Sequence, residues 1–445
     1  MTQLAENRKV SHAVAWIGEL RQQGTARFDH VGFPNSKQEQ WRFTNVGPIA
    51  KTHFAAAGAL RPDKAHDCAV QYGLGGDTAA ELVFVNGHYS PELSQLGKLP
   101  GGVSILSLAD AVVSNSPELQ QNLGQFVEIN GNPFVALNTG SLRDGAFIHF
   151  PSGTVIDGPI HLLFISIADG QPTVTHPRVL IVAEENVEAT IVESYIGQGE
   201  GTYFTNAVSE IVAGQGSRID HCKLQQETQR AYHVSTTQVH LGRSAQFVSH
   251  ATSMGAALCR NDLNVVLAGE HADATLNGLV LLDGNRHCDN HTLLDHAAAH
   301  CPSHELYKHV LTGKSTGVFK GQILVRPDSQ KTDAKQSSKT LLLSDDAMMD
   351  SMPALEIYAD DVKCTHGSTT GPVDEEQVFY LRSRGVGHEA ARHLLTYAFA
   401  ADITRRIRVE PVRARIENFM AAQHGLPQDL RIADLGAHDE AVVNL

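Results

Sequence analysis

The chain has 445 residues, of which 42% are hydrophobic, and its formal net charge at pH 7 is −14. This length indicates two to three domains or one long repetitive domain, and the apolar content is sufficient for a large core. The acidic balance argues against nucleic acid or an anionic membrane as the main partner. No apolar run reaches the ~20 residues that a membrane-spanning helix needs.

Cysteine usage and the first residues of the chain bear on its compartment. The six cysteines are too few and too scattered for a disulfide scaffold, and they fit a reducing cytosol. The N-terminal stretch lacks the basic and apolar blocks of a signal peptide, and it is not rich in Arg and Ser as a transit peptide would be. We therefore expect a cytoplasmic protein of bacterial type. The cysteines are Cys68, Cys222, Cys259, Cys288, Cys301 and Cys364.

The N-terminal region, residues 1–130, is predicted to be a mixed α/β domain. Residues 4–22 carry apolar side chains at helical spacing, which predicts a helix that ends at Gly24. Trp41 and Arg42 could form a binding patch, but we favour a packing role in which Trp41 covers a domain junction. The apolar positions of the predicted helix are Val10, Ala13, Val14, Ile17 and Leu20.

A strand and a tight turn follow in the same region. Residues 81–85 have the composition of a strand, and Asn86-Gly87 is a strong signal for a hairpin turn. Residues 108–123 are predicted to be partly helical.

Residues 131–371 are predicted to form a parallel, right-handed β-helix, which makes the chain mainly β. Short apolar runs alternate with polar turns, and small residues recur about every 28 positions at the heads of these runs. The absence of intervening amphipathic helices argues against a βαβ fold, and the lack of repeated hairpin signals argues against a β-sandwich. Stacked rungs with buried inward faces fit this pattern, and the open end of the stack needs a cap. The markers of the period are Ala189, Ser217, Ala245 and Ala274, followed by Ile191, Ile219, Phe247 and Leu276.

The run from Thr312 to Thr316 looks like the end of a phosphate-binding loop, but the first glycine of that motif is missing. The motif needs a glycine five positions before Gly313, where this chain has Lys308. The residues that follow, GVFKG, do not have a helical pattern, so no helix N-terminus would face a phosphate. We interpret GKSTGVFKG as turns and a short strand of the core.

Residues 287–309 are rich in side chains that could bind a soft metal. A zinc-finger pattern needs paired cysteine and histidine blocks, and here only His296 and His300 have a suitable spacing. We interpret these histidines as surface or turn residues, and we keep a self-sufficient metal-binding protein as an alternative. The residues concerned are His287, Cys288, His291, His296, His300, Cys301, His304 and His309.

The sequence shows no Ser-His-Asp arrangement, and we expect no catalytic residues and no enzyme. β-Helices often carry polysaccharide-cleaving sites, so a carbohydrate-active enzyme is a second alternative. However, no aromatic sugar platform or calcium-ligand cluster is present. The acidic pairs at predicted solvated corners are Asp345-Asp346 and Asp360-Asp361, and the predicted core-strand pairs are His221-Cys222 and Cys259-Arg260.

Residues 372–445 are predicted to be a helical domain. Asp374 is a good N-cap for a first helix, which Gly385 and Gly387 would end. A second helix is predicted over residues 389–407, and a third from Pro411 to near Gly425. The surplus of apolar positions suits docking into a groove on another protein. The basic residues beside them are Arg405, Arg406, Arg413 and Arg415.

Cys364-Thr365-His366 lies where the predicted β-helix meets these helices. In a strand, Cys364 and His366 project from the same face, and a thiolate beside an imidazole suits zinc, copper(I) or iron–sulfur chemistry. Two ligands do not complete a site that usually needs about four, so other parts of the chain or another subunit would have to supply the rest. In the alternative interpretation, Cys364 packs as a small hydrophobic residue and His366 is an exposed turn residue.

Three segments carry a resemblance to a known family. Residues 361–385, DVKCTHGSTTGPVDEEQVFYLRSRG, resemble the C-terminal signature of the SufB/SufD family of iron–sulfur cluster assembly proteins, in its SufD-like branch. Residues 32–46, GFPNSKQEQWRFTNV, and residues 81–94, ELVFVNGHYSPELS, are similar to N-terminal motifs of the family. The stretch from residue 132 to residue 361 is similar to its core, for which the family implies a β-helix.

The resemblance implies a non-catalytic scaffold subunit of the SufBCD complex. It implies pairing with a SufB-like paralogue through the β-helix ends near Cys364 and His366, and docking of SufC-type ATPases on the C-terminal helices. ATP-driven dimerisation of the ATPases would expose the interface, where a transient iron–sulfur cluster could form with His366 as first candidate ligand and Cys364 as second. SufB-like members carry a cysteine near the position of Ser338, so this chain would not build the site alone. The resemblance leaves open whether a flavin binds the complex and whether the isolated chain forms a homodimer.

Overall fold

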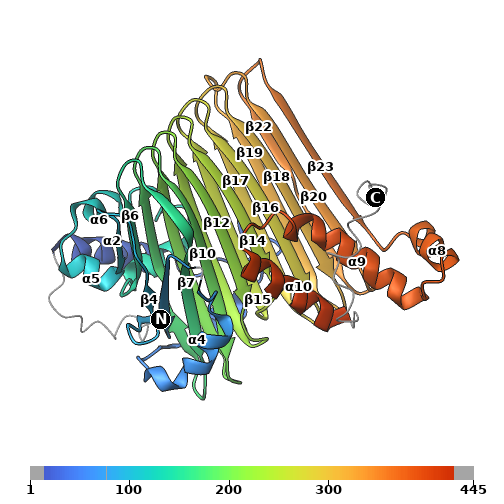
Figure 1. Ribbon diagram of the computed structural model, residues 1–445, viewed down its shortest axis with the longest axis horizontal. Helices are drawn as coiled ribbons and strands as arrows, with labels where there is room; N and C mark the ends of the chain where they lie inside the picture. The colour runs from blue at the N-terminus through green and yellow to red at the C-terminus, as the bar shows by residue number, and fades with distance from the viewer. Residues whose placement is uncertain (1–14, 77, 425–445) are drawn as a thin grey trace.

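A computed structural model describes residues 15–76 and 78–424 of the chain. It is a long parallel β-helix with helices at its N-terminal end and along one side (Figure 1). Among the described residues, one sheet contains 12 strands and the other contains 11, and successive core strands alternate between the two. We call these sheet A and sheet B. The expected fold, a mainly β chain built on a parallel β-helix with flanking helices, is confirmed.

The strands and helices have the following bounds. Sheet A is formed by β1 (Ala55–Ala56), β5 (Ser104–Ser107), β6 (Gly145–Phe150), β8 (Thr173–Thr175), β9 (Arg178–Ala183), β11 (Tyr203–Ala213), β13 (Ala231–Leu241), β15 (Leu258–Leu267), β17 (His287–His296), β19 (Thr316–Val325), β21 (Met348–Ser351) and β22 (Ala354–Ile357). Sheet B is formed by β2 (Ala80–Val85), β3 (His88–Tyr89), β4 (Gln95–Leu96), β7 (Val155–Ile167), β10 (Glu188–Gln198), β12 (Arg218–Gln226), β14 (Gln246–Ser253), β16 (Asp273–Leu282), β18 (Pro302–Leu311), β20 (Asp333–Leu342) and β23 (Lys363–Gly371). The helices are α2 (Ala15–Val31), η1 (Glu39–Trp41), α3 (Gly47–Lys51), η2 (Pro62–Lys64), α4 (His66–Tyr72), α5 (Leu108–Val113), α6 (Pro117–Asn122), α7 (Pro133–Gly140), α8 (Glu375–Ser383), α9 (His388–Thr404) and α10 (Glu410–His424).

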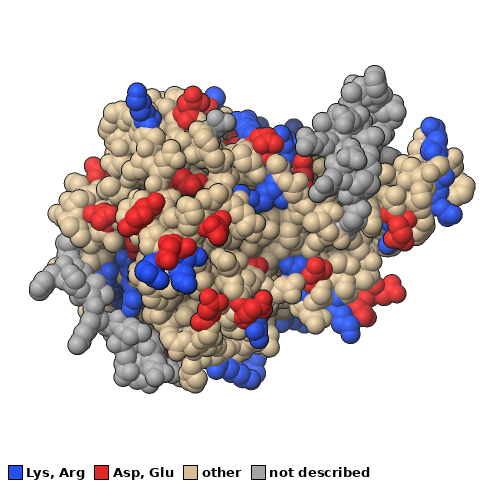
Figure 2. Space-filling view, turned by 60° about the horizontal axis from the view of Figure 1, so that its bottom comes forward, with Lys and Arg blue, Asp and Glu red and all other residues tan. Residues whose placement is uncertain are grey.

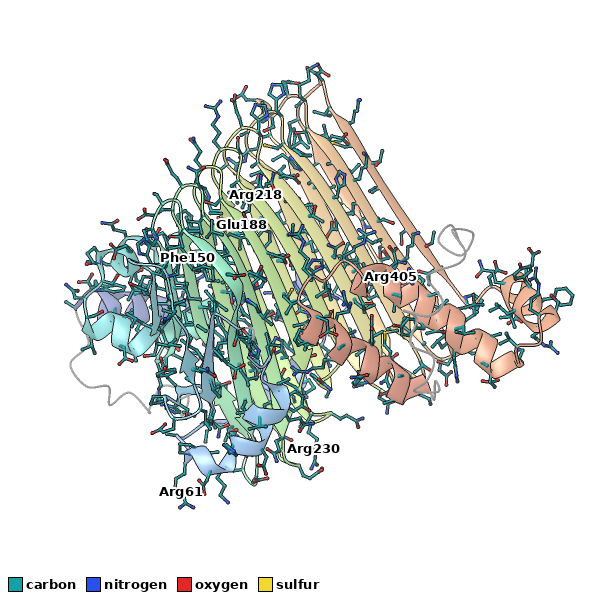
Figure 3. All side chains as sticks on the ribbon, in the orientation of Figure 1. Arg61, Phe150, Glu188, Arg218, Arg230 and Arg405 are labelled. Atoms are coloured by element: carbon teal, nitrogen blue, oxygen red, sulfur yellow. The ribbon has the colours of Figure 1, made fainter. Side chains whose placement is uncertain are left out.

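Each turn of the β-helix stacks on the next in parallel register. Glu188 of β10 pairs with Arg218 of β12, Arg218 with Gln246 of β14, and Gln246 with Asp273 of β16, so each pair joins two residues that lie one rung apart. Glu188 and Arg218 are labelled in Figure 3 at neighbouring rungs along one side of the stack. The spacing along the chain between these partners is close to the predicted repeat, which therefore describes the rungs.

The predicted markers of the repeat do not form one column, which is a correction. Ala189 pairs with Ile219 and not with Ser217, and Ala274 pairs with Phe247 and not with Ala245. The corner loops between strands differ in length, so the rung length varies. A marker chosen by a constant spacing in the sequence can therefore lie two positions away from the residue that is its partner in the sheet.

The inside of the β-helix is the main core. Alternate residues of each strand point inward, and the branched apolar side chains of Ile211, Val239 and Val265 stack there on successive rungs. Burying one such side chain contributes about 1.5–3 kcal/mol.

Helices α9 and α10 cover the outer face of sheet B (Figure 1). Apolar residues of the two helices, including Ile403 and Ile416, pack with outward-facing strand residues such as Leu279 and Val310. Lys308 of β18 binds the α9 end by donating to the Phe399 carbonyl at 2.9 Å and pairing with Asp402 at 2.8 Å. No helix within the described ranges is both long and apolar enough to cross a bilayer.

The segment around Trp41 and helix α7 cover the outer face of sheet A, whereas α4 packs on sheet B. Trp41 is buried between Phe134 and the Arg260 guanidinium, whose carbon lies 4.2 Å from the ring centroid of Trp41. The packing role predicted for Trp41 is thus confirmed. Arg178, which is fully buried, pairs with Glu210 at 2.5 Å and donates to Asn138 of α7, so charge as well as apolar packing ties α7 to the rungs.

The N-terminal helix differs from its prediction. Gly24 does not end it, because α2 continues to Val31. A Cβ at Gly24 would lie 2.5 Å from the Gly140 nitrogen, so Gly24 is the point where the backbones of α2 and α7 touch. The positions expected to begin this helix, Val10, Ala13 and Val14, lie outside the described residues.

The other local predictions agree with the structure. Asn86 and Gly87 both have positive φ and join β2 to β3 in an antiparallel pair, as the Asn-Gly signal predicts. The Asp374 side chain accepts from the Glu376 amide at 2.8 Å and caps α8. The GKST run is a corner that leads into β19, with Gly313 at φ +69°. Residue 425, the predicted end of the last helix, lies outside the described residues.

Candidate functional site

Cys364 and His366 lie in β23, the last strand of sheet B. β23 runs parallel to β20, with Ala334 beside Cys364 and Gln336 beside His366. Ala334 and Gln336 are both buried on the inward face of β20, so the register places Cys364 and His366 on the inward side of the last rung. Cys364 is half-buried and His366 is exposed.

This last rung is the open rim of the β-helix. β23 has β20 as its hydrogen-bonded neighbour and ends sheet B, and β21 and β22 end sheet A in the same way. Figure 1 shows β23 at the end of the stack opposite the N-terminal helices. Apolar side chains on or next to the rim strands are exposed, namely Met348, Ile357 and Tyr358. The rim thus combines free strand edges with exposed apolar surface, which together favour pairing with another chain.

The thiol at the rim needs a partner before it can act as a thiolate. Burial raises the pKa of Cys364, so its sulfur carries a proton at neutral pH. A metal ion or a cationic group brought by a partner would favour the deprotonated form, because a metal ligand must lose its proton. As a candidate ligand, Cys364 therefore depends on such a partner.

The interior directly behind the rim is polar. Glu305, His309, Gln336, Ser338 and Thr340 are buried there on inward positions of β18 and β20. Each has at least one buried polar atom without a hydrogen-bond partner among the described residues. Burial raises the pKa of Glu305 to about 7 and lowers the pKa of His309 to about 3. So many unpaired polar groups are unusual in a core and indicate bound water or a functional role.

A shallow cavity of about 350 Å³ lies on the outer face of sheet B, next to the rim. Its walls come from β16, β18, β20 and β23, and Arg406, which follows α9, closes one side. Arg406 is held by Asn277 at 3.3 Å and by Asp402 at 3.1 Å. Glu305, Gln336 and His366 are also among the residues that line this cavity, so it adjoins the candidate ligand His366.

The histidine-rich segment of residues 287–309 does not form a metal centre in the structure. It spans β17, a corner and β18, and within the described ranges no three or more His, Cys, Asp or Glu side chains converge as metal ligands. The interpretation of these histidines as surface or turn residues is wrong for His296 and His309, which are fully buried. The period-2 alternation of the strands turns them inward, and His296 lies 3.0 Å from the Ser303 hydroxyl. His300 and His304 are exposed, as expected.

A second polar cluster lies inside the middle of the β-helix. The buried Lys223 ammonium donates to Asn261 at 2.8 Å, and Cys259 and Cys288 are register partners on β15 and β17. A hydrogen bond from Cys288 lowers the pKa of Cys259 to about 6. The prediction of His221-Cys222 and Cys259-Arg260 as buried strand positions is confirmed.

Sequence reasoning missed Glu305 and Gln336, which lie directly behind the candidate ligands. Glu305 pairs with Gln336, and Gln336 with His366, so the three occupy one column on successive rungs. Their spacing along the chain follows the rung length. A search for polar residues one rung length and two rung lengths before His366 in the sequence would have found Gln336 and Glu305.

Comparison with known proteins covers most of the chain. Residues 3–162 match the family model for the SufBD protein N-terminal region. Residues 164–399 match the model for the SUF system FeS cluster assembly, SufBD core domain.

Individual relatives are similar along most of their length. An iron–sulfur cluster assembly SufBD family protein of Synechocystis sp. is 32% identical over 94% of this chain and 94% of its own length. The iron–sulfur cluster assembly protein SufD of Escherichia coli is 30% identical over 89% of this chain and 90% of its own length. A SufBD family protein of Mycobacterium tuberculosis is 31% identical over 91% of this chain and 93% of its own length.

Proposed function

Because this chain belongs to the SufBD family of iron–sulfur cluster assembly proteins, we propose that it is a non-catalytic scaffold subunit of a cytoplasmic Suf complex. It pairs with a SufB-like paralogue through the open rim of its β-helix. A nascent iron–sulfur cluster, which is the cargo of the complex, forms at that junction.

The observation that carries this proposal is the position of the two candidate ligands. His366 and Cys364 lie on the last strand of the rod, where sheet edges end and apolar side chains are exposed. Two donors are fewer than the about four that a cluster iron or a zinc ion requires. A second chain that seats on the rim would cover the edges and supply the missing donors at the same time.

His366 is the first candidate ligand and Cys364 the second. The imidazole is exposed and ready to bind, whereas the Cys364 thiol has a raised pKa and must first lose a proton. Ser338, which lies behind them, is a buried hydroxyl and not a thiol, so this chain contributes fewer sulfur donors than a cysteine at that position would provide.

The C-terminal helices supply a second interaction surface, for a SufC-type ATPase. α8 stands away from the β-helix beyond β23 (Figure 1) and exposes the aromatic side chains of Phe379 and Tyr380. α9 and α10 are anchored on sheet B through Lys308 and the apolar contacts described above. A force applied to the helices would therefore reach the last rungs, which is what ATP-driven opening of the rim requires.

The charge distribution on the face shown in Figure 2 does not indicate a strongly charged partner such as a polyanion. Lys and Arg side chains are interspersed there with Asp and Glu over the part of the surface that the described residues form. Such a mixed surface gives no broad field of one sign for steering a polyanion. In the absence of a paralogue, the same rim could pair with a second copy of this chain as a homodimer.

The test is affinity purification of the tagged chain from its own cytosol. We expect the wild-type chain to recover a paralogue and an ATPase. Tyr358→Asp places a charge on the exposed rim and should abolish recovery of the paralogue, since a desolvated charge opposes association. The matched control is Val113→Asp, which changes an exposed apolar residue at the other end of the rod and should leave recovery unchanged. Recovery of neither partner by the wild-type chain would contradict the proposal.

A further inference from the structure

The column behind His366 contains a glutamine whose side chain has one satisfied and one unsatisfied end. Gln336 Nε2 donates to Glu305 Oε2 at 2.6 Å, inside the β-helix. Gln336 Oε1 is buried and has no hydrogen-bond partner among the described residues. An unpaired amide oxygen in a core costs about 1–3 kcal/mol, so its retention calls for a reason.

The position of this amide is fixed by its surroundings. Gly321 of β19, on the opposite sheet, lies against it: a Cβ at Gly321 would be 2.3 Å from Gln336 Nε2 and 2.7 Å from the Phe319 ring. The absence of a side chain at Gly321 therefore creates the space that the amide fills. Gln336 is 3% exposed and Glu305 is also 3% exposed, so neither can relax into solvent.

The register makes Gln336, the residue that carries the unsatisfied oxygen, a direct neighbour of the candidate ligand His366. Gln336 and His366 are direct partners on the parallel strands β20 and β23, and neighbouring strands in a sheet lie about 4.8 Å apart. Both side chains project from the inward face, one rung apart. Within the described residues the His366 ring makes no hydrogen bond, so both of its nitrogens are free for a new partner.

We propose that Gln336 is a positioning residue for His366: its Oε1 accepts the N–H of the ring nitrogen that faces it, while Glu305 holds the other end of the amide. This inference rests on the proposed role of His366 as a ligand. With the proton fixed on the inner nitrogen, the lone pair of the outer nitrogen points out of the rim and is free for iron. We call this chain of hydrogen bonds, from Glu305 through Gln336 to His366, the relay. It forms in both protonation states of Glu305, because Glu305 Oε2 accepts from Gln336 whether or not Glu305 Oε1 carries a proton.

The relay also gives a reason for the two buried polar side chains of Glu305 and Gln336 directly behind the rim. An amide is an uncharged side chain that can donate at one end to a carboxyl group and accept at the other end from an imidazole. Leucine at position 336 would fill the same space and pack with Phe319, but it would leave Glu305 without its donor and His366 without its acceptor. In this proposal, Glu305 and Gln336 position His366 and do not stabilise the core.

The experiment reads the tautomer of His366 in the isolated full-length chain by ¹⁵N–¹H correlation spectra of histidine-labelled protein, recorded well above the ordinary histidine pKa. His366→Gln identifies the signal of His366 by its loss. We expect the wild type to show one dominant tautomer, and Gln336→Leu to shift it toward the mixture of a free imidazole. Gln336→Glu keeps an acceptor facing the ring and should retain the single tautomer. Ser338→Ala, which removes a neighbouring inward hydroxyl, is the matched control and should change nothing.

A mixture of tautomers in the wild type, or an unchanged His366 signal in Gln336→Leu, would overturn the proposal. If Gln336→Leu does not fold, loss of the single tautomer in Gly321→Ala tests the same contact, because the added methyl group displaces the Gln336 amide. The readout needs neither partner nor cluster. If the tautomer of His366 depends on Gln336 but affinity purification recovers no partner, only the proposed complex is contradicted. If purification recovers both partners but the tautomer does not depend on Gln336, only the relay is contradicted.

Discussion

At the scale of single residues, the interior next to the rim contains buried polar side chains whose burial costs folding free energy. Glu305 is the clearest example, because burial raises its pKa from the ordinary value of 4.5 to about 7. A carboxyl whose pKa is higher in the folded chain favours folding at low pH. Its contribution is complete below about pH 4.5 and is lost as the pH rises through 7.

Glu305→Gln tests this sign directly. The shift of the Glu305 pKa corresponds to about 3 kcal/mol that the wild type loses between pH 4.5 and a pH above 7. The variant cannot ionise, so we expect it to match the wild type at low pH and to unfold at higher temperature above pH 7. Thermal unfolding followed by circular dichroism across this range measures the difference. Glu188→Gln, at an exposed carboxyl in the same sheet, serves as control, and an equal response of both variants would refute the assignment.

At the scale of elements, close backbone contact fixes the N-terminal helices on the rod. Gly24 of α2 lies against Gly140 of α7, and a Cβ there would be 2.5 Å from a backbone nitrogen and 2.8 Å from the Ala136 oxygen. Backbone atoms cannot move aside as a flexible side chain would. The two helices must separate to admit a methyl group.

Gly24→Ala should therefore destabilise the protein by about 1–3 kcal/mol, the usual cost of overpacking. Gly18→Ala, in the same helix but with no atom within 4 Å of the new methyl group, should be neutral or stabilise by up to about 1 kcal/mol. Denaturant unfolding of both variants gives the comparison. Equal stability of the two variants would show that the α2–α7 contact is not as tight as described.

The elements also show where sequence reasoning succeeds. Asn86-Gly87 and Asp374 carry local signals of turn and cap chemistry, and both predictions hold. Gly24 is predicted to end a helix because glycine usually marks an end, but here a tertiary contact uses it inside a helix. The rung period could be predicted, while the exact columns could not, since corner loops of different length shift the register.

The same limit applies to the candidate site. Cys364 and His366 stand out through their spacing and through the family resemblance. Gln336 lies one rung before His366 and Glu305 lies two rungs before it, so both become its neighbours only through the register of β18, β20 and β23. The inward orientation of His296 and His309 has the same cause, because the face of a strand residue depends on the register of the whole rung.

At the scale of the whole molecule, N-terminal elements close one end of the rod, and at the other end the outermost strands have no further neighbour among residues 15–76 and 78–424. At the closed end, β5 pairs antiparallel with β6, and β2 adds to β7. At the open end, β23 carries the two proposed donors, Cys364 and His366, which are too few to complete a coordination shell. The proposed function follows from this asymmetry, since the open end requires a partner both for its edges and for its ligands.

The most direct measurement is the iron and acid-labile sulfide bound to the complex after co-expression of this chain with its paralogue and ATPase and anaerobic purification. We predict that the wild-type complex carries both. His366→Ala should lose most of the iron and sulfide while still recovering both partners, because it removes a ligand and not the fold. His304→Ala, which changes an exposed histidine on the outer face of β18, two strands away from β23, should carry as much iron as the wild type. Full iron and sulfide in the His366→Ala complex would contradict the account.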